Sequence, residues 1–311
     1  MARNGGGRKC GSANAHGLAA PSGDRAFNQN IRSRLGSSVR SCFAVRSKLK
    51  MHGPNRSKGA KLTGSTLTKA DPQAFADVQA LVFDVFGTVV DWRTGVAREA
   101  APFLARYRPD ADPAAFADAW RRRYSPSMEE VRSGRRPFTR LDVLHRENLA
   151  ATLLEFGIEP SSAPPSELDA LNLAWRRLDP WPDSVPGLVR LKRRFIIAPL
   201  SNGNIRLMLD MAKRAGLPWD AILGAEVAQA YKPAPEAYLR TVEALMLNPE
   251  EVCLVAAHNN DLAAARRCGL RTAFIHRPTE HGPDQTTDLQ PEEAWEAVAN
   301  NMEDLARQLG L

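Results

Sequence analysis

Short apolar runs alternate with amphipathic segments through most of the chain after residue 70. The apolar runs have the length and composition of strands, and the segments between most of them repeat their apolar positions at helical spacing. Strands that alternate with helices predict a parallel sheet with helices on both faces. The predicted strands are Ala80–Phe86, Phe195–Ser201, Ala221–Val227, Val252–Ala257 and Thr272–His276, and the helices between them include Ile205–Ala215, Pro235–Leu245 and Asp261–Cys268.

More than 100 residues separate the first two predicted strands. This interval has the pattern of four amphipathic helices, and prolines punctuate its end. We therefore expect an α/β protein with a Rossmann-like core and a helical cap domain inserted into it. The predicted helices lie around 94–107, 113–133, 138–157 and 166–178, the cap spans 94–183, and the core consists of 71–93 and 184–311.

The charge of the chain is divided unevenly. Residues 1–70 hold 14 of the 42 Lys and Arg residues but one of the 35 acidic residues, so they carry +13 and residues 71–311 carry −6. A mildly acidic body argues against nucleic-acid binding by that part. No apolar run approaches the roughly 18 residues of a membrane helix, and four scattered cysteines indicate neither a disulfide framework nor a zinc cluster. We expect a cytoplasmic protein without a membrane partner.

Residues 1–70 are predicted to form a disordered basic extension, because a segment with ten Gly, nine Ser and two aromatic residues buries too little apolar surface to fold. Three interpretations of this extension are open. It is a basic arm for nucleic acid or an anionic membrane, a transit peptide, or translated upstream sequence without a role.

Polar side chains follow four successive predicted strands. In open α/β sheets, ligands bind outside the carboxyl ends of the strands, so we expect these side chains to meet in one crevice. The Ser-Asn pair after the second strand either caps the next helix or binds an anion at its start. The side chains are Asp84 after the first strand, Ser201 and Asn202 after the second, Lys232 after the third, and His258 and Asp261 after the fourth.

Asp84 is the most informative of these residues. A carboxylate within an apolar run is costly unless it is paired, which indicates a nucleophile or a ligand. Gly87 permits a tight turn behind it, and the Thr88 hydroxyl can donate a hydrogen bond to it. Lys232 is expected to be its counter-ion, whereas Asp91 is expected to cap a helix.

The ordered set resembles the haloacid dehalogenase superfamily over about residues 78–311, and within it the L-2-haloacid dehalogenase group, also called haloacid dehalogenase type II. Four motifs carry the resemblance. They are D-x-[YF]-G-T at Asp84–Thr88, S-N-G at Ser201–Gly203, Y-K-P-x-x-x-x-Y at Tyr231–Tyr238, and a W-R pair on a cap helix at Trp120–Arg121.

The resemblance implies hydrolysis of short (S)-2-haloacids to (R)-2-hydroxyacids. Asp84 would attack the halogen-bearing carbon and form an ester, with Lys232 keeping it ionised and with Arg121 and Asn202 receiving the halide. Water would then attack the ester with the help of Asp261. By resemblance, the catalytic residues are Asp84, Thr88, Arg121, Lys232 and Asp261, and the substrate-binding residues are Phe86, Ser201, Asn202, Tyr238 and His258.

Most members of the superfamily are magnesium-dependent phosphohydrolases, and these need an acid two residues after the nucleophile and a further metal-ligating Asp. Phe86 and Ala257 stand at those two positions, so neither a metal nor a cofactor is expected. The expected partners are a 2-haloacid substrate and water, and the chain could also form a homodimer. The alternatives are a magnesium-dependent phosphohydrolase and a catalytically degenerate binding protein.

Two residues depart from the type II pattern. Ala256 and His258 stand where this group usually has Ser and Asn. His258 could replace the Asn as a hydrogen-bond partner, activate the hydrolytic water, or fill the same space. Whether fluoride can leave depends on the tightness of the pocket, which the sequence leaves open.

Overall fold

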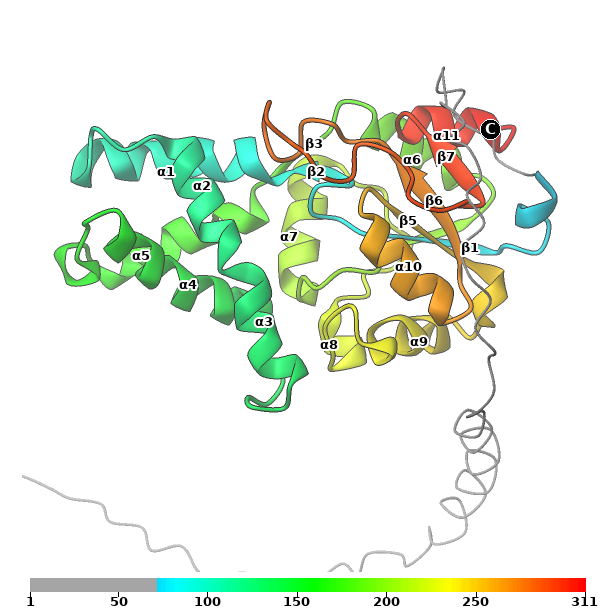
Figure 1. Cartoon of the computed structure of the whole chain (residues 1–311), viewed down its shortest axis with the longest axis horizontal. Helices are drawn as coiled ribbons and strands as arrows, with labels where there is room; N and C mark the ends of the chain where they lie inside the picture. The colour runs from blue at the N-terminus through cyan, green and yellow to red at the C-terminus, as the bar shows by residue number, and fades with distance from the viewer. Residues whose placement is uncertain (1–71) are drawn as a thin grey trace, which may run out of the picture. The chain divides into compact units, whose positions relative to one another are not determined.

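The core of the protein is a five-stranded parallel sheet. The structure is a computed structural model that describes residues 72–311 (Figure 1), so the predicted disordered extension lies outside the described residues. The strand order β4-β1-β5-β6-β7, with helices between most of the strands, confirms the predicted α/β Rossmann-like class. The strands are β1 (Ala80–Phe83), β4 (Ile196–Pro199), β5 (Val252–Ala256), β6 (Arg271–Ile275) and β7 (Ala297–Ala299).

Alternate residues of the strands are buried on opposite faces of the sheet. Leu81 and Phe83 belong to an apolar cluster with residues of α6, α7 and α11, whereas Ala80 and Val82 belong to a cluster with residues of α9 and α10. Burial on both faces explains why β1 is apolar throughout. The helices are α6 (Ser184–Leu191), α7 (Ile205–Ala215), α9 (Pro235–Ala244), α10 (Asn259–Arg267) and α11 (Met302–Gln308).

Five helices between β1 and β4 form a group beside the sheet (Figure 1). As expected, Asp91 caps the first of them by accepting a hydrogen bond from the Thr94 backbone N–H. None of the helices within residues 72–311 combines the length and the apolar character needed to cross a membrane. The five are α1 (Trp92–Tyr107), α2 (Pro113–Arg122), α3 (Tyr124–Arg132), α4 (Leu141–Glu155) and α5 (Pro165–Asn172).

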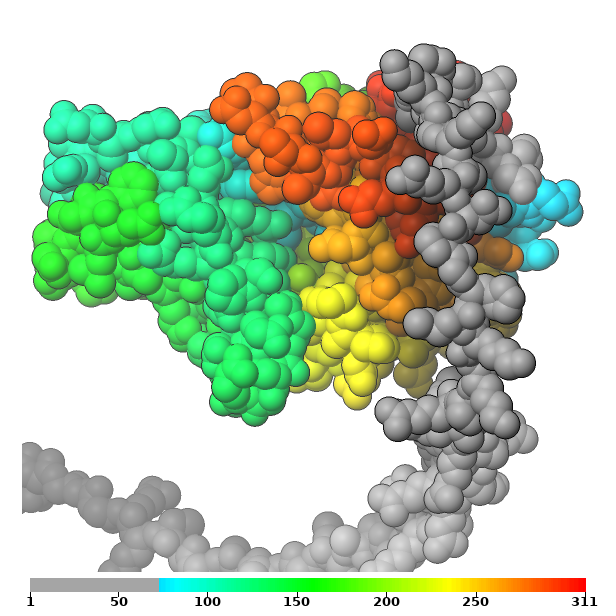
Figure 2. Space-filling model, in the orientation of Figure 1, coloured from blue at the N-terminus to red at the C-terminus, as the bar shows by residue number. Residues whose placement is uncertain are grey.

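A short antiparallel ladder lies where the chain enters and leaves this group of helices. Strand β2 (Val90–Asp91) pairs with β3 (Asp179–Pro180). Figure 2 shows that the surface of the helical group adjoins the surface of the loop between β6 and β7 on one face of the molecule. Because β2 precedes the five helices and β3 follows them, their pairing holds the start and the end of the helical segment side by side.

Two predictions of secondary structure were wrong, and one strand was missed. The single helix predicted at 113–133 is divided at Arg123, because Pro126 has no N–H to donate to the carbonyl of residue 122 and its ring disfavours that turn. The predicted strand Ala221–Val227 is one bridge at Leu223 followed by α8 (Ala225–Ala228). A short apolar run does not distinguish a strand from a helix, which also explains why the alanine-rich β7 was missed.

Candidate active site

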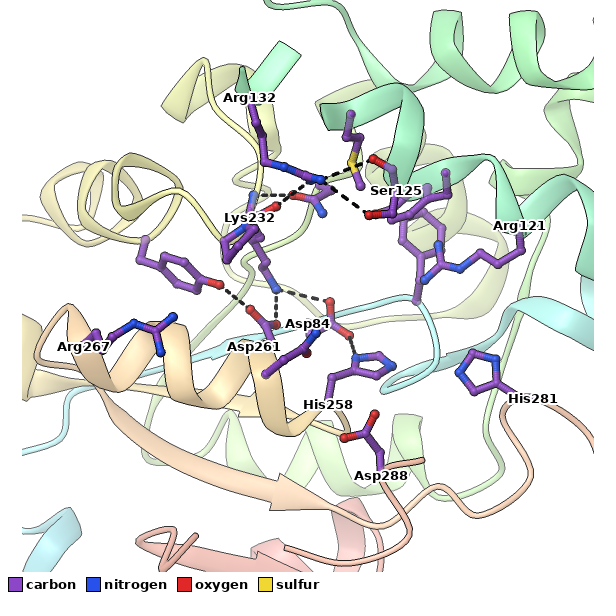
Figure 3. A pocket seen from close by; sticks show the side chains of 17 residues that line it. Asp84, Arg121, Ser125, Arg132, Lys232, His258, Asp261, Arg267, His281 and Asp288 are labelled. Carbon is purple, nitrogen blue, oxygen red and sulfur yellow. Dashed lines mark hydrogen bonds and ion pairs between the residues drawn. The ribbon is translucent and has the colours of Figure 1, made fainter. Parts of the chain in front are cut away.

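A pocket of about 470 Å³ lies at the carboxyl ends of β1, β4 and β5, under helices α2 and α3 (Figure 3). Strand β1 is where the strand order reverses, since β4 lies on one side of it and β5 on the other. Ligands of open α/β sheets bind at such a point. The segments that line the pocket are the residues after β1, the α2–α3 region, the loop after β4, the start of α9, the start of α10, and the loop between β6 and β7.

Asp84 lies at the base of this pocket with three neighbours for its carboxylate. Lys232 Nζ is 3.2 Å from Oδ1, and Oδ2 accepts from Thr88 Oγ1 at 2.8 Å and lies 3.2 Å from His258 Nδ1. Burial raises the pKa of Asp84, but the Lys232 ammonium and the contacts of His258 and Thr88 lower it further, so that the net pKa is well below its usual range. Asp84 is therefore a largely buried carboxylate, 13% exposed, that is held ionised.

The Thr88 hydroxyl has a fixed orientation. It accepts a hydrogen bond from the Ala257 backbone N–H at 2.9 Å, which directs its own proton to Asp84. Thr88 and Ala257 are both buried. The Ala257 side chain is a methyl group, so this position contributes a backbone donor and no metal ligand.

Lys232 bridges two carboxylates. Its Nζ lies 2.6 Å from Asp261 Oδ2 as well as 3.2 Å from Asp84, and its side chain is 8% exposed. Burial lowers the pKa of Lys232, but the two carboxylates raise it to a larger extent, which keeps the ammonium charged. Asp261 also accepts from the Tyr238 hydroxyl at 2.6 Å, and the Asn202 side chain accepts from the Lys232 backbone N–H at 2.8 Å.

His258 lies between Asp84 and a second buried carboxylate. Its Nε2 is 2.8 Å from Oε2 of Glu280, whose side chain is 1% exposed and whose Oε1 accepts from Trp92 Nε1 at 2.9 Å. Burial lowers the pKa of His258, but Glu280 and Asp84 together raise it well above its ordinary value. In the resting site His258 is therefore a cation between two anions.

The Arg121 side chain extends from α2 into the pocket, where its guanidinium packs against three aromatic rings. Its guanidinium carbon lies 4.0 Å from the ring centre of Tyr124, 5.2 Å from Trp92 and 5.8 Å from Phe86. Its Nη1 is buried and has no hydrogen-bond partner within residues 72–311. An unpartnered guanidinium donor within apolar walls favours an incoming anion.

Most of the sequence-predicted site residues lie together here. Thr88 contacts Asp84 without lining the pocket, whereas the Ser201 hydroxyl accepts from the Gly203 backbone N–H and does not line it. Sequence reasoning missed Glu280 and Tyr124. Glu280 lies beyond the fifth predicted strand in a loop without a periodic pattern, so no short stretch of sequence marks it as a site residue. The predicted residues that line the pocket are Asp84, Phe86, Arg121, Asn202, Lys232, Tyr238, His258 and Asp261.

Comparison with known proteins places this geometry in context. The profile of the haloacid dehalogenase-like hydrolases matches residues 78–269. The (S)-2-haloacid dehalogenase 4A of Burkholderia cepacia is 29% identical over 72% of this chain and 96% of its own length. The (S)-2-haloacid dehalogenase 1 of Pseudomonas sp. (strain CBS-3) is 31% identical over 64% of this chain and 85% of its own.

Solved structures agree with the sequence matches. A defluorinating L-2-haloacid dehalogenase has a TM-score of 0.75 and 54% identity, over 79% of this chain and 100% of that one. The L-2-haloacid dehalogenase of Xanthobacter autotrophicus with chloropropionic acid covalently bound has a TM-score of 0.62 and 26% identity, over 75% of this chain and 98% of that one.

Proposed function

Because the chain belongs to the haloacid dehalogenase-like hydrolase family, we propose that it hydrolyses the carbon–halogen bond of short (S)-2-haloacids and releases (R)-2-hydroxyacids. One observation carries the proposal. An ionised, buried Asp84 shares a pocket with Arg121, a guanidinium that has an unpartnered buried donor. The first is suited to displace a leaving group, and the second is suited to receive an anion.

The first half of the reaction is displacement of the halide by the Asp84 carboxylate. Lys232 and Thr88 hold the carboxylate in place, so an oxygen of Asp84 can attack the carbon from the side opposite the halogen, which inverts the configuration. The departing halide gains negative charge as the bond breaks, and Arg121 and Asn202 would stabilise it. Backbone donors near Ser201 and Asn202 would hold the carboxylate of the substrate.

This step needs no proton and no metal. A halide leaves as a stable anion, unlike the alcohol that leaves from a phosphate ester. The two positions at which magnesium-dependent relatives carry an acid and a metal ligand hold the ring of Phe86 and the methyl group of Ala257, neither of which transfers a proton or binds Mg²⁺. The donor set therefore supports dehalogenation over phosphate hydrolysis.

The second half is hydrolysis of the ester on Asp84, and we assign water activation to His258 with Glu280. Ester formation removes the negative charge of Asp84, which is one of the two charges that raise the pKa of His258. The imidazole can then lose its Nδ1 proton to solvent, and the free Nδ1 can accept a proton from the attacking water, while Glu280 accepts the hydrogen bond of Nε2 and orients the ring. Asp261 accepts from Lys232 and Tyr238 with its two oxygens, so its proposed role is to orient Lys232 beside the ester.

The proposed reaction uses a small haloacid and water. We also propose a cytoplasmic location, which the unbridged thiols Cys253 and Cys268 support. We likewise propose a homodimer, on the basis of the family resemblance alone.

A paired assay tests the proposed function. Chloride release from (S)-2-chloropropionate and phosphate release from p-nitrophenyl phosphate are measured, each with EDTA and with added Mg²⁺. We expect chloride release that EDTA leaves unchanged, with (R)-lactate as the product and no phosphate release. Phosphate release that requires Mg²⁺, without chloride release, would contradict the proposal.

A further inference from the structure

Three potential metal ligands meet at one wall of the pocket. The nearest ligand atoms of His258, Glu280 and His281 all lie within 4.8 Å of one another. His258 Nε2 is 2.8 Å from Glu280 Oε2, and His281 Nε2 is 3.7 Å from Glu280 Oε1. Figure 3 shows the rings of His258 and His281 beside one another at the edge of the pocket. The His281 side chain is 41% exposed, which gives an ion a path from solvent.

Two imidazoles and one carboxylate are a ligand set that suits Zn²⁺ and leaves a coordination position open. Zinc bonds of about 2.0–2.1 Å place tetrahedral ligand atoms about 3.3 Å apart. The two histidines approach different oxygens of Glu280, at 2.8 and 3.7 Å, and one ligand atom from each of the three residues lies within 4.8 Å of the other two. Small side-chain shifts, with the half-exposed His281 moving inward, would therefore form the site.

His258 and Glu280 have the hydrogen-bond partners that metal-binding histidines and carboxylates usually have. A metal-bound histidine almost always donates its second ring N–H to a carboxylate, carbonyl or water, and His258 Nδ1 lies 3.2 Å from Asp84 Oδ2. Ligating carboxylates are usually hydrogen-bonded as well, and Glu280 accepts from Trp92 Nε1. Because Glu280 is buried, its position is fixed before any ion arrives.

We propose that His258, Glu280 and His281 bind a Zn²⁺ ion and that the bound ion inhibits hydrolysis of the Asp84 ester. The inhibition rests on the proposed function. Zinc would replace the proton on His258 Nε2, releasing that proton to solvent, and would bind the Glu280 carboxylate. With zinc on Nε2, Nδ1 keeps the remaining ring proton, so His258 could no longer accept a proton from water.

The position of the ion distinguishes inhibition from metal-assisted catalysis. The two nitrogens lie on opposite sides of the His258 ring, with Nδ1 toward Asp84 and Nε2 toward Glu280. Water on the zinc would therefore be on the far side of the imidazole from the ester. Displacement of the halide needs no proton, so it would continue until every Asp84 carries an ester.

The test uses the full-length protein, freed of metal with EDTA and then desalted. With (S)-2-chloropropionate, one equivalent of Zn²⁺ is expected to reduce steady-state chloride release at least about tenfold, after a burst of one chloride per chain. Mass spectrometry of the stalled enzyme should show the ester on Asp84, and EDTA should restore the rate. Undiminished or faster turnover with zinc would overturn the proposal.

Variants locate the ion. His281→Ala, and His281→Gln, which retains more of the side-chain volume, should keep the zinc-free rate within about twofold and raise the zinc concentration for half-inhibition at least about tenfold. The matched control is His276→Ala, which removes an imidazole outside the cluster and should remain as sensitive to zinc as the wild type. Equal zinc sensitivity of the His281 variants and the wild type would refute the site.

A binding measurement separates this proposal from the proposed function. Co²⁺, used as a spectroscopic probe in place of zinc, should give visible absorption bands that Zn²⁺ abolishes and that His281→Ala weakens. If the wild type released no chloride without metal, the proposed function would be wrong, while the cobalt bands would still report the site. Absence of the bands in the wild type would show that the three residues bind no such ion.

Discussion

Oε1 of Glu280 occupies the space where a Cβ atom on Gly87 would lie. Gly87 also has a φ of +89°, a backbone conformation that L side chains rarely adopt. The turn behind the nucleophile therefore requires glycine for two independent reasons, and one of them is the carboxylate that contacts His258.

Gly87→Ala should slow ester hydrolysis more than ester formation, because the new methyl group displaces Glu280 from His258. We expect kcat to fall at least tenfold, which corresponds to about 1.4 kcal/mol of barrier. Rapid-quench measurement of chloride should still show a burst of one chloride per chain. A variant without a burst would indicate that the turn positions Asp84 rather than the water-activating pair.

Arg121→Lys should lower kcat tenfold or more, because an ammonium keeps the charge but loses the planar donor group and its stacking on Tyr124. The matched control is Arg122→Lys. Arg122 is the neighbouring arginine of α2, its side chain is 61% exposed, and it pairs with Glu155. Steady-state chloride release from the control should remain within about twofold of the wild type, since exposed ion pairs contribute little. An equal loss of kcat in both variants would show that Arg121 has no special role in halide binding.

The charge of His258 should make stability depend on pH. Its pKa is raised in the folded state above the unfolded value of about 6.5, so the folded state binds the proton more tightly. This stabilisation is fully present below pH of about 6.5 and is lost as the pH rises through the folded pKa. Urea unfolding should therefore show that His258→Gln loses more stability at mildly acidic than at alkaline pH.

Glu280→Gln provides the comparison for that experiment. It removes one of the two carboxylates that raise the pKa of His258, so the window in which stability falls should move to lower pH. An unchanged window would mean that Asp84 alone holds the proton on His258.

A single turnover in ¹⁸O-water with excess enzyme distinguishes the ester mechanism from direct attack by water. If Asp84 forms an ester, the hydroxyl of the product carries unlabelled oxygen and the label remains on Asp84, which mass spectrometry of the peptide can measure. Labelled product with unlabelled Asp84 would instead make Asp84 a general base. Asp84→Asn should release no chloride in the same assay.

The residues at the ends of strands were predictable because their signal is local. Asp84 interrupts an apolar run, and Lys232 follows the third run, whichever secondary structure that run adopts. Convergence of these residues follows from the topology of a parallel sheet and needs no knowledge of side-chain contacts.

Glu280 was not predictable in the same way. It lies in the loop between β6 and β7, which has no periodic pattern. Distant contacts determine its place, among them the hydrogen bond from Trp92 and the pair of hydrogen bonds from Asn259 to Asp288 that holds the far part of the loop. No short window of sequence contains both partners of such contacts.

The two-residue ladder of β2 and β3 has a mechanical consequence. Residues 92–178 join the sheet through these adjacent strands, and across the pocket Arg132 donates a hydrogen bond to the Lys232 carbonyl at 3.1 Å. Further hydrogen bonds from Tyr231 to the Thr139 carbonyl and from Asn204 to Asp142 join the same two parts, so the helices are fastened to the sheet at several points besides the ladder. A rotation of the helices about the ladder would have to break these bonds, and it would carry Arg121 away while Asp84 and Lys232 stay together on the sheet. Such a rotation would separate the guanidinium proposed to receive the halide from a nucleophile that keeps its own hydrogen-bond partners.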